Sequence, residues 1–153
     1  MIVDPPDPCS QPIRSRKILQ EACVTDFPNF HDGFFEGLLV TDNKRVHFFL
    51  RTSDRRRFTL ILDGVEAMKL GNVRNGNILF GVAVIKSEDL TFSHVADVYD
   101  VPSGNGREDR LNHLLAVART RALVGLELSS SYGAEGVALA RSAEIYPDFR
   151  FNN

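Results

Sequence analysis

Two runs of alternating apolar residues, separated by a short charged stretch, constrain this chain more than any other feature. Successive side chains of a β-strand point to opposite faces of the sheet. Between residues 46 and 62 this alternation places a wholly apolar set on one face: Val46, Phe48, Leu50, Phe58, Leu60 and Leu62. The other face is mixed: His47, Phe49, Arg51, Thr59 and Ile61. The pattern predicts two antiparallel strands joined through the turn Ser53-Asp54-Arg55-Arg56, with one buried and one partly exposed face.

Further strands are expected on both sides of this pair. Residues 34–40 are apolar and precede turn-forming residues at 41–44, and residues 78–85 form an almost wholly apolar strand that we expect to be central in its sheet. Asn75-Gly76 before it predicts a type I′ turn. Residues 90–92 and 95–101 are weaker strand candidates, and residues 65–70 fit either a strand or a single helical turn.

The C-terminal part of the sequence predicts one helix and then a hairpin. A stripe at helical spacing predicts a helix over about residues 106–120 that lies against the sheet: Leu111, Leu114, Leu115 and Ala118. Asn105 with Glu108 fits a capping box at its start. The hairpin comprises residues 123–131 and 137–146, and Arg141 is the one charged residue on the apolar face of its second strand.

The first residues differ in composition from the rest of the chain. Pro5, Pro6, Pro8 and Pro12 predict a flexible arm over residues 1–12, and a short helix is plausible over residues 14–23. The remaining residues, 13–153, are expected to form one globular domain. We therefore predict the α+β class, dominated by an antiparallel sheet that is curved or folded into a sandwich or open barrel.

Composition argues against several classes of function. A formal net charge of −2 over 153 residues gives no general attraction to nucleic acid or to an anionic membrane. No apolar run approaches the about 20 residues of a membrane-spanning helix, and the N-terminus lacks the apolar core of a signal peptide. Cys9 and Cys23 are then expected to be reduced thiols in the cytoplasm. No cofactor-binding motif is present.

His31-Asp32 is the only pair that suggests metal chemistry, because HD-type phosphohydrolases use such a pair. Those enzymes gather further histidines around the metal, whereas here His47, His94 and His113 are isolated. A site that combines His31, Asp32 and His94 is one interpretation. The other is structural, with His31 and Asp32 satisfying backbone groups in the loop before the first strand.

A basic cluster surrounds the turn between the two central strands: Arg51, Arg55, Arg56 and Arg57. Charged turns are ordinarily solvated. Guanidinium groups also match the geometry of phosphates and carboxylates, so the cluster is a candidate binding patch for an acidic partner.

Short segments spread over residues 30–146 resemble a family of small bacterial proteins grouped with the immunity proteins of polymorphic toxin systems, the family numbered fifty. The segments that carry the resemblance are Phe30-His31-Asp32, residues 58–65, residues 77–80, residues 126–133 and residues 143–145. The stretch that holds the predicted 106–120 helix departs from the pattern. The resemblance implies a non-catalytic protein that neutralises a toxin by binding it, and it implies no catalytic residue.

Three hypotheses follow from the sequence. The first is a non-catalytic protein-binding module of the immunity type. The second is a small ligand-binding protein or enzyme with a site in the mouth of the curved sheet, using some of His31, Asp32, His47, His94 and Arg51. The third is a structural subunit of a homo-oligomer, which would be favoured if residues 78–85 formed an exposed edge.

Overall fold

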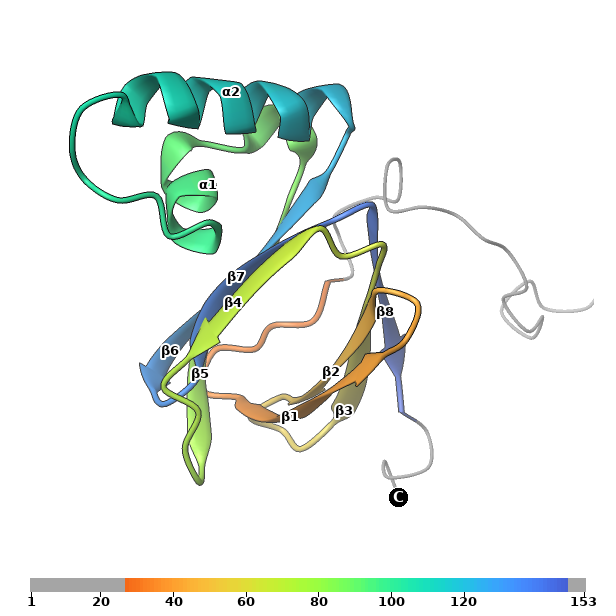
Figure 1. Ribbon diagram of the computed structural model, residues 1–153. Coiled ribbons are helices and arrows are strands. Elements are labelled where there is room, and N and C mark those ends of the chain that lie inside the picture. The colour runs from red at the N-terminus through yellow and green to blue at the C-terminus, as the bar shows by residue number, and fades with distance from the viewer. Residues whose placement is uncertain (1–26, 149–153) are drawn as a thin grey trace, which may run out of the picture.

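The computed structural model describes residues 27–148, which form one strongly curved, unclosed antiparallel sheet of eight strands with two helices (Figure 1). The expected α+β class is confirmed. The strands are β1 (Phe34–Thr41), β2 (Arg45–Arg51), β3 (Arg57–Asp63), β4 (Ala67–Gly71), β5 (Asn77–Ile85), β6 (Val124–Tyr132), β7 (Glu135–Ala140) and β8 (Ser142–Pro147). Their order is β4-β7-β6-β5-β1-β2-β3-β8. The predicted arm at 1–12, the helix at 14–23 and both cysteines lie outside the described residues.

The concave side of the sheet encloses the larger core. All six residues of the predicted apolar face of β2 and β3 are buried there, which confirms the alternation. Phe30, in the loop before β1, packs its ring edge-on against Phe58, with the ring centroids 5.7 Å apart. Residues of the N-terminal loop therefore help to fill the curved sheet.

The sheet bends where β3 passes into β4 and β7 passes into β8. At this corner the backbone N–H of Arg141 donates to the carbonyl oxygen of Asp63 at 3.0 Å. Gly64 has φ of 63°, and a Cβ there would lie 2.8 Å from the Arg141 side chain. The second strand predicted for the hairpin, residues 137–146, is wrong because the bend divides it into β7 and β8. Val137 and Leu139 pack toward the helices, whereas Ala143 and Ile145 face the inner core. Arg141 is the break between two strands, not a charge on one continuous apolar face.

β5 lies between β6 and β1, so its expected central position is confirmed. The type I′ turn expected before it is wrong: Gly76 has φ of 81°, whereas Asn75 is not left-handed. The loop also closes no hairpin, because β4 pairs with β7 and not with β5. For residues 65–70 the sequence fitted either a strand or a helical turn. The structure shows a strand there, because β4 begins at Ala67.

The helices pack on the convex side of the sheet. The strands expected within 90–101 are wrong: this segment contains α1 (Phe92–Val98), which packs against β7 and β4. A capping box starts it, in which the His94 ring nitrogen accepts the Thr91 backbone N–H at 2.9 Å. The predicted 106–120 helix is α2 (Arg107–Thr120), with Leu111, Leu115 and Ala118 buried as expected. Its N-cap is Gly106 with no side-chain cap, so the capping box expected from Asn105 and Glu108 is wrong. α2 packs mainly on α1, which separates it from the sheet (Figure 1).

Asn77 is a buried polar side chain at the start of β5, and it joins three segments. Its side-chain oxygen accepts the backbone N–H groups of Arg74 at 2.7 Å and Ala134 at 3.0 Å. Its amide nitrogen donates to the carbonyl oxygen of Phe35 in β1 at 3.4 Å. The loop before β5, the β6–β7 turn and β1 are thereby held together at one point.

We expect Asn77→Ala to lower the free energy of unfolding by about 2–3 kcal/mol, because it leaves backbone N–H groups without an acceptor in a buried site. Urea denaturation measures the change. The matched control is Ser131→Ala, an exposed residue of β6, which should change the value by less than about 0.5 kcal/mol. Equal effects of the two substitutions would contradict the role given to Asn77.

Candidate functional site

The two halves of the sheet differ in what covers their convex side. The helices pack over β4 and β7, whereas no described helix packs against the half made of β1, β2, β3 and β8. Cross-strand pairing aligns the outward side chains of this second half in rows. We call this surface the open face, and its residues are Phe34, Glu36, Leu39, His47, Phe49, Arg51, Arg57, Thr59, Ile61, Glu144 and Tyr146. It contains the mixed face predicted for β2 and β3.

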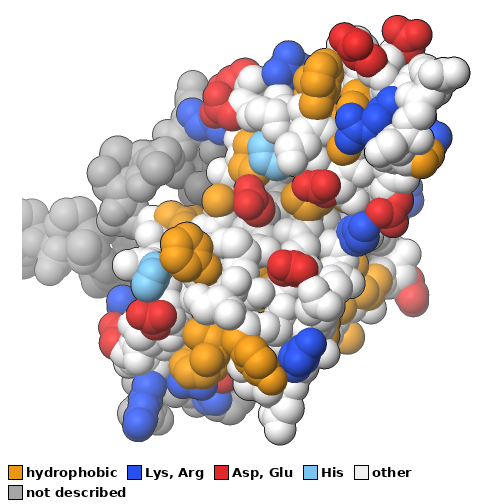
Figure 2. All heavy atoms as spheres, turned by 90° about the vertical axis from the view of Figure 1, so that its left-hand side faces the viewer, with side chains coloured by type: hydrophobic (Ala, Val, Ile, Leu, Met, Phe, Trp, Pro, Cys, Tyr) orange, Lys and Arg blue, Asp and Glu red, His pale blue; other side chains and the backbone are white. Residues whose placement is uncertain are grey.

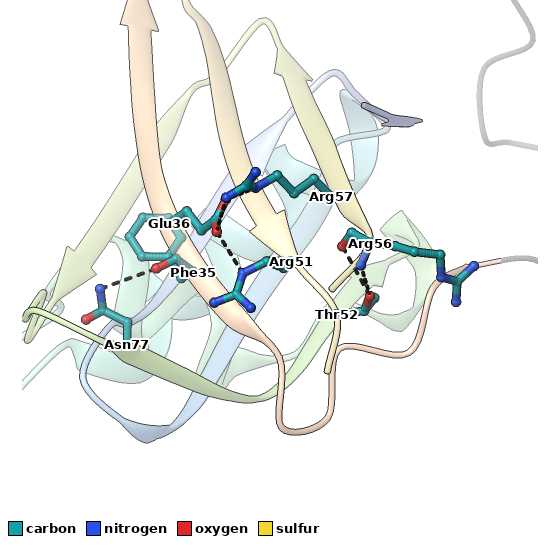
Figure 3. A network of polar contacts seen from close by, with 7 residues as sticks. All are labelled: Phe35, Glu36, Arg51, Thr52, Arg56, Arg57 and Asn77. Carbon is teal, nitrogen blue, oxygen red and sulfur yellow. Dashed lines mark hydrogen bonds and ion pairs between the residues drawn. The ribbon is translucent and has the colours of Figure 1, made fainter. Parts of the chain in front are cut away.

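At one end of the open face, Glu36 holds two arginines (Figure 3). The carboxylate oxygens of Glu36 accept the Nε–H groups of Arg51 at 2.8 Å and Arg57 at 3.0 Å. The Arg51 guanidinium also lies over the Phe34 ring, 4.1 Å from its centroid. These groups are only partly buried, so each ion pair contributes at most about 1 kcal/mol to stability. Their larger effect is to fix the direction of both guanidinium groups.

Glu36 lies in a β-bulge. Phe35 pairs with Leu50 and Gly37 pairs with Phe49, so Glu36 is an extra residue between two regular pairs. The extra residue shifts the alternation, so that both Glu36 and Gly37 lie on the convex side between the inward-facing Phe35 and Leu38. The Glu36 side chain thus points to the side where the arginines lie.

Exposed apolar and aromatic side chains form the middle of the open face. Phe49 is 36% exposed, and Leu39 and Tyr146 are each about half exposed. The hydroxyl of Tyr146 donates to the carboxylate of Glu144, and this hydrogen bond raises the pKa of the tyrosine. The middle of the face thus joins aromatic surface to a few oriented polar groups.

The β2–β3 turn borders the open face and carries the other two predicted arginines. Thr52 is buried, and its hydroxyl accepts the Arg56 backbone N–H at 3.1 Å (Figure 3). Arg56 pairs with Asp54 at 2.9 Å. Arg55 is exposed with φ of 71°, and its guanidinium has no hydrogen bond or ion pair to residues 27–148. The four arginines therefore lie together, as the sequence suggested, but three of them already contact carboxylates of this chain.

His31 and Asp32 lie in the loop before β1. Nδ1 of His31 is 3.0 Å from a carboxylate oxygen of Asp32, and the Asp32 backbone N–H donates to the carbonyl of Leu79. Both side chains are exposed, and the His31 ring lies 5.2 Å from that of Phe80.

The other histidines considered with this pair occupy different elements. His47 is on the open face, and His94 is on α1, 3.7 Å from Glu127 of β6. Within residues 27–148, no three His, Cys, Asp or Glu side chains lie close enough to hold a metal ion. The structure does not bring His31, Asp32 and His94 into one metal site.

Sequence reasoning missed Glu36, Leu39 and Tyr146 as members of the candidate site. Glu36 is 15 residues from Arg51 and 21 residues from Arg57, and only the register of the strands brings them together. The β3–β8 pairing places Tyr146 beside Thr59. Gly37, which follows Glu36 inside an apolar strand, was the one local sign of a bulge.

The side of the molecule where the helices lie over the sheet has a different surface (Figure 2). Its hydrophobic side chains form several small groups, separated by charged side chains and by uncharged polar side chains or backbone. No helix among residues 27–148 is long and apolar enough to cross a membrane.

Comparisons with protein-family models, with curated proteins and with solved structures found no match.

The β2–β3 turn gives a prediction about pH. The hydrogen bond from Thr52, followed by the contact with Arg56, holds the pKa of Asp54 below its ordinary value. A lowered pKa means that the ionised Asp54 stabilises the folded state. This contribution is present above the unfolded pKa of about 3.9 and is lost as the pH falls through the folded pKa. In Thr52→Val the pKa of Asp54 should rise toward the ordinary value, as measured by NMR titration of its carboxyl carbon. Thr52→Ser keeps the hydroxyl and should keep the lowered pKa; an identical titration in both variants would contradict this assignment.

Proposed function

We propose that this protein is a non-catalytic protein-binding module and that the open face is the surface that contacts its partner. The observation that carries the proposal is the combination of exposed aromatic and apolar side chains with arginines fixed by Glu36, on the half of the sheet that no described helix covers. Aromatic residues and arginine are enriched at protein interfaces and among the residues that dominate binding energy.

The arginines indicate the chemistry of the partner. Arg51 donates its Nε–H to Glu36, and its terminal nitrogens make no hydrogen bond to residues 27–148. Arg55 extends from the adjoining turn without a partner among those residues. Carboxylates are the natural ligands of such groups. We therefore expect a protein that presents acidic side chains beside an apolar patch.

The specific version of the proposal is a role of the immunity type, in which binding neutralises a toxin. The resemblance described above supports it. The chain is only weakly acidic overall, at −2, so attraction to a basic nuclease is not its main feature. An arginine-bearing face is better matched to a toxin whose contact surface is acidic.

The proposal is tested by affinity capture from the native cell with the full chain, followed by calorimetry with the purified partner. We expect one stoichiometric protein. Phe49→Ala and Arg51→Ala should each weaken its binding by about 2 kcal/mol, roughly 30-fold, as truncations at the centre of an interface do.

The matched control is Val117→Ala on α2, because Val117 is 37% exposed and Phe49 is 36% exposed. This control should bind the partner as the parent protein does. Failure to retain a stoichiometric protein would overturn the proposal. So would a partner whose affinity is the same for the parent protein, Phe49→Ala and Arg51→Ala.

A further inference from the structure

Residues 37–41 of β1 form an edge of the sheet that has no strand beside it and carries no charged residue or proline. β1 pairs with β5 only at Phe34–Ile78 and Phe35–Asn77. Because the two strands are antiparallel, residues 37–41 run past the start of β5. On the side away from β2 they have no strand partner among residues 27–148. Every second residue of this segment directs its backbone N–H and C=O to that empty side.

The edge borders an opening in the curved sheet. β4, the strand at the other side of this opening, also has one unpaired side, since it pairs with β7 alone (Figure 1). The opening is closed at one end by the hydrogen bond from Val65 N–H to the carbonyl of Lys44, at 2.8 Å. At the other end Asn77 bonds Phe35. Within these limits the sheet is not hydrogen-bonded into a ring.

The inward side chains along the opening are apolar and incompletely covered. Leu38, Met68 and Leu70 are half-buried, and Val40 is 57% exposed. An apolar strand laid against β1 would cover them. Its other side chains would face outward and extend the open face by one strand.

The unpaired edges of the sheet differ in their chemistry. Natural proteins block free edges with charged residues, prolines or bulges, because an unblocked edge pairs with other chains. β4 carries Lys69 at its centre, and β8 carries Glu144 and Pro147. Residues 37–41 are Gly-Leu-Leu-Val-Thr, with no charge and no proline. Residues 81–85 of β5 also lack a strand partner on their β1 side among residues 27–148, and they too carry no charge. Only residues 37–41 lie beside the opening, where Val40, Met68 and Leu70 are incompletely covered.

Charge argues against a second copy of this chain as the occupant. Two β1 edges paired antiparallel about Leu39 would place Glu36 of one copy opposite Asp42 of the other. Like charges in opposed positions destabilise a strand pair. A strand that carries a cation at its end would instead meet Asp42, whose carboxylate forms no hydrogen bond or ion pair with residues 27–148.

We propose that the β1 edge at residues 37–41 binds an extended, mainly apolar strand of the partner protein, flanked by lysine or arginine. This inference rests on the proposed function, since it names the element by which the partner of the open face is held. Backbone hydrogen bonds supply affinity in this mode of recognition, and alternate side chains supply specificity.

The first test uses a defined probe, the blocked peptide Lys-Val-Thr-Val-Thr-Val-Lys, titrated into the isotope-labelled full chain. We expect saturable changes in the NMR signals of residues 37–41 and of the Met68 methyl group. A peptide with proline at the central valine should bind about tenfold more weakly, because proline lacks the N–H that pairs with an edge. Replacing both lysines by glutamates should also weaken binding. No saturable change at millimolar peptide, or changes elsewhere in the protein, would overturn the inference.

The second test uses Val40→Lys, which places a charge on the opening without altering the open face. It should weaken the peptide about tenfold, since a lysine on an edge opposes pairing. Phe80→Lys is the control, because Phe80 is 60% exposed on β5, and it should bind as the parent does. Concentration-dependent signal changes of residues 37–41 without peptide would show self-pairing and overturn the choice of a partner strand.

The two proposals fail in different ways. A captured partner that is weakened by Phe49→Ala but not by Val40→Lys would leave the proposed function standing and overturn this inference. A missing partner would overturn the proposed function, while the peptide titration would still decide whether the β1 edge accepts a strand.

Discussion

The hydrogen bonds of the Asn77 side chain hold together the point where the two halves of the sheet meet. β1 and β5 share only two paired positions, so regular backbone pairing contributes little there. Asn77 adds a bond to Phe35 in β1 and two bonds that fix the neighbouring loop and turn. Gly133 is required beside it, since a Cβ at that position would lie 2.4 Å from the Asn77 side-chain oxygen. The buried amide and the glycine define the place at which the sheet changes direction.

The opposite corner, at Gly64 and Arg141, decides which surfaces remain available. There the paired ribbons β3–β4 and β7–β8 bend together, and the residues on their convex side change character across the bend. Before the bend in β7, Val137 and Leu139 provide an apolar surface, and the helices cover it. After the bend in β8, the convex side carries Glu144 and Tyr146, which stay in solvent. One bend therefore divides a single sheet into a half that supports helices and a half that can meet another molecule.

The parts of the fold that followed from the sequence are those set by local periodicity. The inner face of β2 and β3 depends on period two within seven residues, and α2 depends on a stripe along one helix. α1 was missed because its short apolar segment fits a strand equally well, and docking of Val95 and Val98 in the helix–sheet core selects the helix. The arginine cluster was visible in the sequence, but its geometry was not, because Glu36 reaches it only through strand register. His31 and Asp32 show the reverse case: adjacency in sequence suggested metal chemistry, and the fold supplies no converging third ligand within residues 27–148.

The bulge at Glu36 connects the two proposed binding features. Glu36 faces outward to Arg51 and Arg57, which orders the charged end of the open face, and the extra residue returns Leu38 and Val40 to the inner side. The bulge also falls just after the last residue of β1 that pairs with β5, and bulges bend the strand that contains them. β5 begins at Asn77, opposite Phe35, so β1 continues past it with its edge uncovered. A regular strand continued from the inward-facing Phe35 would still point Glu36 outward, but it would turn Leu38 and Val40 away from the core. The same local irregularity thus lies between the fixed arginines and the free edge, and it sets the inward direction of the apolar side chains along that edge.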